Sequence, residues 1–367
     1  MGNNKISQLQ LISIGGCYLL GSIVVSVFIS SVASNEAWLI GLFGGIFFIP
    51  VLLVYLSLAK RYPGKNLLQM NDAAFGPAVG RIVSLIYLLF FLTLCALNIL
   101  EASNFLHYFM MTETPLIVIA SFLMLTCVYC IKKGIAPIAR VSTVFGLIAT
   151  VGIVFNILLS AKHSNIQNLF PIFDLKMLDY IQSTHVAVSI PFGESLVLLM
   201  FHSDLSEKAS IKKVYIWVAI ITVLVMTAVH LREAASLGSM LPYATLPSYE
   251  AVRMINISNI LSRTESIFSL LLVSLTFFKI LILFYISASG IAQVFGLRSY
   301  RHLTLMLAAL LVVYAVKAYG SPSNNIFWGK NVSPFIWSFF TFLIPLGTAL
   351  VAALMPHARK RQKGAEA

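Results

Sequence analysis

A run of helix-breaking and acidic residues lies in the middle of an apolar segment at residues 184–203. Pro191 lacks a backbone N–H and clashes with the preceding helical turn, and Gly193 lowers the cost of non-helical backbone angles. Glu194 follows directly, and a carboxylate in hydrocarbon is costly unless it faces protein, water or a cation. The run predicts a helix interrupted at mid-membrane, with Phe192 and these three residues beside a bound small molecule.

A matching interruption is expected in the first apolar segment, where Gly21 and Ser22 are central. A break there would start an outer half-helix near Ile23, whose free N–H groups and positive dipole end suit a ligand carboxylate. Carbonyl groups freed near residues 190–193 would accept hydrogen bonds from a ligand ammonium. The alternative for Gly21 and Ser22 is close helix packing. The two breaks together predict recognition of an amino-acid-like ligand at the midplane.

Lys279, Glu101 and Asn98 are further candidates for structural or coupling roles. Lys279 lies near the middle of an apolar segment, where snorkelling to an interface is difficult. A structural ion pair with Glu194 is one explanation for both charges. Asn98 and Glu101 are about one helical turn apart and share a helix face. They either line an outer vestibule, or Glu101 reaches the outer interface.

The composition is that of a polytopic membrane protein. The chain has 367 residues, of which 59% are hydrophobic and 10% are charged, and its mean hydropathy is +0.91. Soluble domains carry about 25% charged residues. The net charge of +12 is spread over short loops between apolar segments, as membrane topology requires, so a nucleic-acid partner is not expected.

Ten apolar segments are long enough to cross a bilayer. They lie at about residues 9–30, 37–59, 80–106, 115–131, 141–161, 184–203, 214–235, 264–291, 303–320 and 334–355. Two long connections, 162–183 and 236–263, contain amphipathic stretches, and we expect helices there on the outer face.

The loop charges orient the chain. Every expected inner loop carries Lys or Arg, which places both termini in the cytoplasm. Ten spans divide into two groups of five, and an odd number per group gives the groups opposite orientations. We therefore predict one all-α transmembrane domain, residues 1–367, with inverted repeats at about 9–161 and 184–355 and a cytoplasmic tail at 356–367.

Motifs for nucleotide binding and hydrolysis are missing from the sequence. It contains no P-loop, no dinucleotide fingerprint and no G-x-S-x-G element. Its seven histidines do not cluster as metal ligands, and one C-x-x-C pair does not make a metal site. We expect neither an enzyme nor a protein with a cofactor or metal.

Five short motifs resemble the B subunits of spore germinant receptors, which belong to the amino acid–polyamine–organocation superfamily. They are Ile-Ser-Gln-Leu-Gln at 6–10, Leu-Gly-Ser-Ile at 20–23, Tyr-Pro-Gly-Lys at 62–65, Pro-Phe-Gly-Glu at 191–194 and Phe-Lys-Ile at 278–280. The resemblance covers about residues 5–355. Pro-Phe-Gly-Glu in a sixth span is the most specific of these motifs, and the Gly-Ser pair is shared with the wider superfamily.

The resemblance implies a leucine-transporter-like fold of ten helices with broken first and sixth helices. It also implies a receptor subunit in the inner membrane of a dormant spore, working with a larger A subunit and a lipoprotein C subunit on a germinant such as an amino acid. In sodium-coupled members of the superfamily a cation lies between the first and eighth spans. We hypothesise that the Lys279 ammonium takes that cation's part.

Three functions remain open from the sequence. The resemblance favours a sensor that triggers germination when its ligand binds. The same broken helices would also serve a proton-coupled or facilitative amino acid permease. A ligand-gated pore for ions or water is the third possibility.

Overall fold

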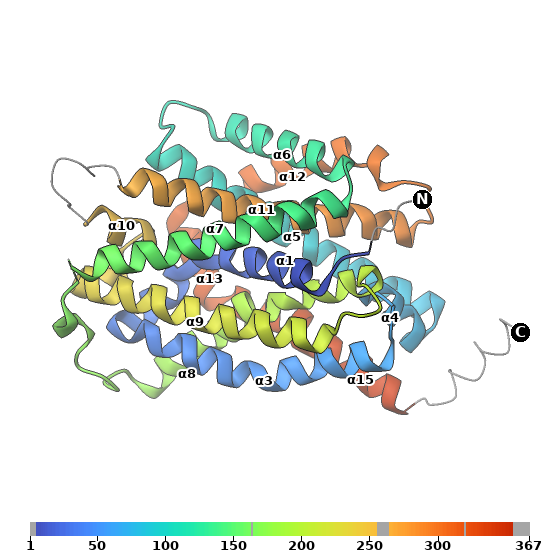
Figure 1. Ribbon diagram of the computed structural model, residues 1–367, viewed down its shortest axis with the longest axis horizontal. Helices are drawn as coiled ribbons and strands as arrows, with labels where there is room; N and C mark the ends of the chain where they lie inside the picture. Colours follow the sequence, from blue (N-terminus) through green and yellow to red (C-terminus); the bar gives the residue numbers. More distant parts are fainter. Residues whose placement is uncertain (1–4, 163, 255–263, 319–320, 355–367) are drawn as a thin grey trace, which may run out of the picture.

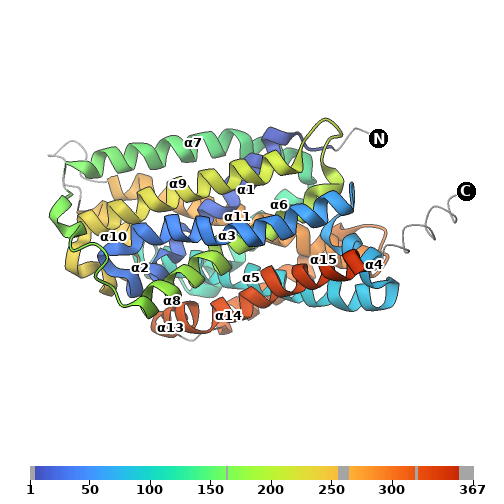
Figure 2. The ribbon, with the colours of Figure 1, turned by 90° about the horizontal axis from the view of Figure 1, so that it is seen from below.

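The computed structural model describes residues 5–162, 164–254, 264–318 and 321–354. These residues form an all-helical bundle whose long helices run roughly along one axis (Figure 1, Figure 2). Within the described ranges there is no β-strand, only an isolated bridge between Ile6 and Leu205. Many large apolar side chains, such as Phe47, Phe122 and Leu147, are exposed on the outside of the bundle. Such a surface suits contact with lipid.

Each expected span coincides with one helix or with consecutive helical segments. In chain order they are α1 (Gln8–Leu20) with α2 (Val27–Ala33), α3 (Ala37–Arg61), α5 (Pro77–Phe109), α6 (Leu116–Lys132), α7 (Ile135–Ala161), α8 (Met177–Ala187) with its continuation to Asp204, α9 (Ile211–Leu237), α11 (Thr264–Val294), α12 (Thr304–Lys317), and α14 (Ser333–Ser338) with α15 (Ile344–Leu354). Among the described residues, seven helical stretches are long and apolar enough to cross a membrane, and three shorter apolar helices accompany them.

The α-helical hydrogen bonding changes at both predicted interruptions. Residues Gly21–Ser26 form a 3₁₀ segment between α1 and α2. Residues Val188–Phe192 form a π-helical turn around Pro191, and a 3₁₀ segment continues from Gly193 to Asp204. Since proline supplies no N–H to the helical ladder, the backbone around Pro191 adopts wider turns instead.

Three short helices lie outside the ten expected spans. They are α4 (Leu67–Phe75), α10 (Pro247–Arg253) and α13 (Pro322–Asn331). Figures 1 and 2 place α4 and α10 at opposite ends of the bundle. The sequence predicted a helix in the connection that contains α10 but did not predict α4 or α13. In the other long connection the structure has a short 3₁₀ turn, Ile166–Leu169, and α8 starts at Met177, earlier than expected.

The segment before α1 is attached to the end of the sixth expected span. The backbone N–H of Ile6 donates to Asp204 O at 2.7 Å, and the N–H of Ser206 donates to Ile6 O at 3.0 Å. Ser7 then caps α1 in a reciprocal box with Gln10, which satisfies N–H groups at the helix start. The entry to the first span and the exit from the sixth therefore lie side by side.

Candidate ligand-binding site

A buried ion pair joins the segments that the sequence singled out. Nζ of Lys279 lies 2.7 Å from Oε2 of Glu194 and donates a hydrogen bond to Oγ of Ser22, also at 2.7 Å. The three residues are 1–2% exposed. The Tyr18 hydroxyl donates to the same Glu194 oxygen at 3.5 Å, and the Tyr18 ring centroid lies 5.4 Å from the ammonium. One ammonium thus connects the first, sixth and eighth expected spans.

The second oxygen of Glu194 is also occupied. Nε1 of Trp337, on α14, donates to Oε1 of Glu194 at 3.2 Å. Both carboxylate oxygens and the ammonium therefore have partners, which a buried ion pair needs to offset the loss of hydration. The pairing of Lys279 with Glu194 was one of the alternatives that the sequence left open, and the structure has this pair.

The first interruption packs directly against α11. A Cβ atom added to Gly21 would lie 2.9 Å from Leu275 O and 3.0 Å from Cβ of Lys279. Only a residue without a side chain lets the two backbones come this close. Gly21 therefore serves helix packing in this structure. Ser22 binds Lys279, and Ile23 is buried in an apolar cluster with residues of α11.

The second interruption is held by side chains from neighbouring helices. The Tyr55 hydroxyl lies 2.9 Å from Gly193 O and 2.5 Å from Thr341 O, so the carbonyl of Gly193 already has a donor nearby. Phe192 is fully buried and stacks on Phe48 with ring centroids 5.5 Å apart. Pro191, which directly precedes Phe192, is also buried and lies within the π-helical turn.

A cavity borders the ion pair. The space in it that water-sized spheres can occupy is about 40 Å³, which is smaller than a small-molecule site, so a ligand would fit only after the lining residues move apart. Four of the predicted residues line it: Asn98, Glu101, Glu194 and Lys279. The other predicted residues, Gly21, Ser22, Ile23, Pro191, Phe192 and Gly193, are not among the residues that line it.

Two of the other lining residues, Asn325 and Gly329, come from a segment that the sequence analysis did not single out. These two residues are on α13, and Trp337 on α14 and Phe28 on α2 line the same cavity. The Phe28 ring packs tightly on Gly329, where an added Cβ would meet ring atoms at 2.3 Å. The asparagines and glycine of the segment 321–331 interrupt its apolar character, and this was the available signal that it does not simply connect two spans.

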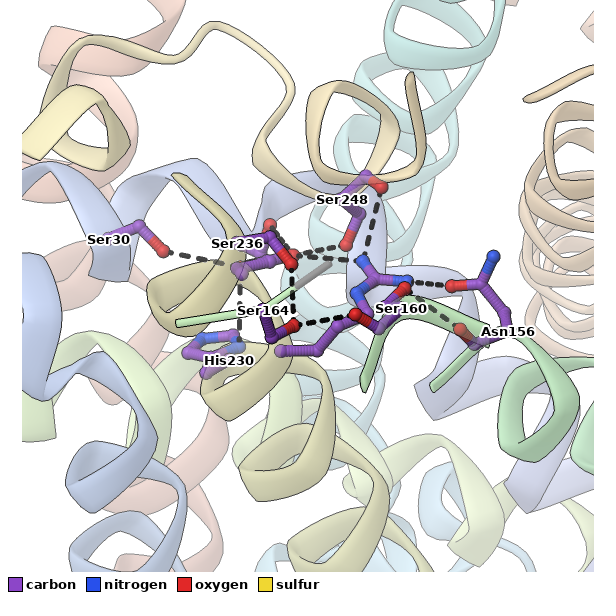
Figure 3. Close-up of polar contacts among 10 residues, drawn as sticks. Ser30, Asn156, Ser160, Ser164, His230, Ser236 and Ser248 are labelled. Atoms are coloured by element: carbon purple, nitrogen blue, oxygen red, sulfur yellow. Dashed lines mark hydrogen bonds and ion pairs between the residues drawn. The ribbon is translucent and has the colours of Figure 1, made fainter. Parts of the chain in front are cut away.

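A second buried polar cluster lies near the α10 end of the bundle (Figure 3). Glu233 on α9 is fully buried. It accepts hydrogen bonds from Ser26 at 3.3 Å and Ser30 at 3.5 Å, on either side of the start of α2, and from Ser248 on α10. Oε1 of Glu233 also lies 3.9 Å from the Arg232 guanidinium. Ser26 and Ser30 therefore face Glu233 inside the bundle, whereas Ser22 faces Lys279.

Arg232 extends the same cluster to α7 and α11. Its guanidinium donates to the side-chain oxygen of Asn156 and to Ser248 O, and it lies 5.1 Å from the Phe268 ring centroid. His230 lies 3.8 Å from Glu233, and neither of its ring nitrogens has a hydrogen-bond partner. The sequence analysis did not single out this cluster. An Arg-Glu pair at the end of an apolar segment was its signal.

Among the residues that the structure describes, no three His, Cys, Asp or Glu side chains are grouped as metal ligands. The polar groups of the cavity are two carboxylates, one ammonium, two amides, one serine and one indole. Such a set can bind a small polar ligand by hydrogen bonds and charge.

A family model described as "Spore germination protein" matches residues 5–321. This chain belongs to that family. The spore germination protein KB of Bacillus subtilis (strain 168) is 24% identical over 372 residues, covering all of both chains. The spore germination protein A2 of the same organism is 20% identical and covers 95% of this chain and 96% of its own.

The fold of this spore germination protein is that of a transporter. The nucleobase-cation-symport-1 family transporter Mhp1, solved in a closed conformation with bromovinylhydantoin bound, matches with a TM-score of 0.68. The match covers 100% of this chain and 96% of the transporter, at 14% sequence identity. This match confirms an all-helical fold like that of this transporter, and the apolar helical stretches together with the family membership indicate an integral membrane protein.

Proposed function

We propose that this protein is the germinant-sensing membrane subunit of a spore germinant receptor. A small amino-acid-like ligand binds in the cavity beside the Lys279–Glu194 pair once the lining residues have moved apart, and triggers germination. The observation that carries the proposal is this cavity, bordered by a buried ion pair that joins three spans. The family membership and the fold of a transporter with a bound small molecule support it.

In this proposal the Lys279 ammonium takes the part of a free cation between the first and eighth spans. Its contacts with Ser22 on one side and Glu194 on the other are consistent with that part. Ligand binding is then independent of sodium. The protein sits in the spore inner membrane with cytoplasmic termini and ten spans in two inverted repeats, and it works with A and C subunits.

A ligand shifts the protein between two arrangements only if it binds one of them more tightly. Glu194 and Trp337 line the cavity and belong to two different helices, so a ligand between them changes how those helices pack. Partner subunits that contact these helices would then detect whether the cavity is occupied.

The alternative function is an amino acid permease, which the transporter fold favours. Binding of radiolabelled amino acids to the purified protein, with uptake into proteoliposomes measured in parallel, separates the two. The sensor predicts saturable binding, lost in Glu194→Gln, without accumulation and without a sodium requirement. Accumulation driven by a pH gradient would show a permease, and a current on ligand addition would show a pore. Gly21→Ala is a poor probe here because its methyl group disturbs packing against α11.

A further inference from the structure

The part of the cavity away from the ion pair contains a carboxylate with a neutral partner. Oε1 of Glu101, on α5, accepts a hydrogen bond from the Asn325 amide of α13. Asn98 lines the cavity about one helical turn before Glu101. Glu101 is half-buried, and the apolar side chains of Leu94 and Leu97 also line this cavity.

The charges of the lining do not balance. Lys279 neutralises Glu194 at 2.7 Å, whereas an amide, which carries no charge, is the hydrogen-bond partner of Glu101. With Glu101 ionised, the described lining residues therefore sum to one negative charge. A half-buried carboxylate whose hydrogen-bond partner is a neutral amide is costly to keep ionised, and a ligand with a positive group would lower that cost.

Lys279 could bind the negatively charged group of a ligand whose positive group lies at Glu101. The Lys279 ammonium has three N–H donors, and within the described parts of the chain Ser22 and Glu194 are the acceptors that contact it, each at 2.7 Å. The third donor is available to a ligand carboxylate in the cavity that Lys279 lines. A ligand with a cation at one end and a carboxylate at the other therefore matches the cavity better than a simple amine or a simple acid.

We propose that Glu101, oriented by Asn325, binds the ammonium group of the ligand, and that the ligand is a zwitterionic amino acid oriented with its carboxylate towards Lys279. This proposal rests on the proposed function, because it names the ligand class of the same cavity. It replaces the carbonyl groups near residues 190–193 as the ammonium site. It also gives α13 a direct part in recognition.

Competition binding to the full-length protein tests the proposal. Radiolabelled amino acids identify a ligand of the wild type, and three analogues of that ligand then compete with it: the 2-hydroxy acid, the decarboxylated amine and the carboxamide. The variants are Glu101→Gln, Glu101→Asp and Asn325→Ala, and Glu207→Gln, on an exposed inner-loop side chain, is the matched control. Thermal unfolding of each variant shows that it is folded.

Removing one partner of a buried charged contact costs about 2–5 kcal/mol, so Glu101→Gln should weaken binding at least about 30-fold. Glu101→Asp should restore part of the affinity, and the hydroxy acid should compete poorly with the wild type. Asn325→Ala should weaken binding less than Glu101→Gln. Wild-type affinity in Glu101→Gln, or strong competition by the hydroxy acid, would overturn the ammonium site and leave the proposed function standing. If the wild type bound no amino acid, that result would contradict both the ammonium site and the proposed function.

Discussion

Nζ of Lys279 and Oε2 of Glu194 lie 2.7 Å apart although the two residues are 85 positions apart in the chain. Lys279 is in a continuous helix, and Glu194 follows the π-helical turn around Pro191. The irregular backbone places the carboxylate beside the ammonium, and Trp337 and Ser22 complete the hydrogen bonds. The interruption of the sixth span therefore positions a charge as well as opening the helix.

Replacing Lys279 with methionine should destabilise the protein by about 3–5 kcal/mol, because Glu194 would remain buried without a cation. The double variant Lys279→Met, Glu194→Gln should recover much of this loss, since no unpaired charge is left. Unfolding can be followed with a thiol-reactive dye, because three of the four cysteines are buried. Equal stabilities of the single and double variants would show that the two charges are not coupled.

Trp337 should report ligand binding, because its indole borders the cavity and donates to Glu194. We expect an amino acid ligand to change the tryptophan fluorescence of the wild type. Trp337→Phe should abolish that change and weaken binding, because a hydrogen bond to a charged group contributes about 1.5–3 kcal/mol. Trp217→Phe, on an exposed part of α9, is the control and should keep the signal. A persisting signal in Trp337→Phe would place the ligand elsewhere.

Gly329→Ala should reduce ligand affinity about tenfold, because the added methyl group meets the Phe28 ring and overpacked contacts cost about 1–3 kcal/mol. Phe28→Leu in the same chain should restore binding by making room. Gly347→Ala is the matched control, since a Cβ there meets nothing within 4 Å. Titration with the labelled amino acid measures all four proteins, and an unchanged affinity in Gly329→Ala would separate α13 from the site.

Glu233→Gln should lower the melting temperature strongly, since it leaves Arg232 buried beside a neutral amide. Ser248→Ala should have a smaller effect, because Arg232 keeps its bond to the Ser248 carbonyl. Glu250→Gln, on the same helix as Ser248 but outside the cluster, serves for comparison. The order of melting temperatures tests whether Glu233 holds α2 and α10 to α9, and a Glu233→Gln protein as stable as Glu250→Gln would contradict it.

The stability difference between Asp72→Asn and the wild type should depend on pH. Burial raises the pKa of the Asp72 carboxyl, and Arg81 partly opposes this rise. A raised folded-state pKa means that the contribution of Asp72 to stability is greatest below its unfolded pKa of about 4 and is lost as the pH rises through the folded value. Asp72→Asn cannot ionise, so it should gain stability relative to wild type between about pH 4 and pH 8. A difference in melting temperature that is constant over this range would contradict the prediction.

Much of the architecture was predictable from the order of apolar and polar residues. A bilayer requires long apolar helices, so all ten expected segments fall on helices. The interruptions were predictable because proline and glycine act on their own backbone, within a few residues. Glu194 and Lys279 were identifiable because a charge in an apolar segment needs a partner.

The partners of those charges were decided by the tertiary structure. The contacts of Glu101 with Asn325, and of Ser26 and Ser30 with Glu233, join residues about 200 or more positions apart. Helical periodicity gives the face on which a side chain lies but not the helix that it meets. The part of α13 in the cavity lining depends on packing in the same way. The polar residues of α13 become part of a site only where this helix meets α2 and α5. The sequence alone therefore determined the spans and their breaks, and the packing of the spans determined the cavity and its charge.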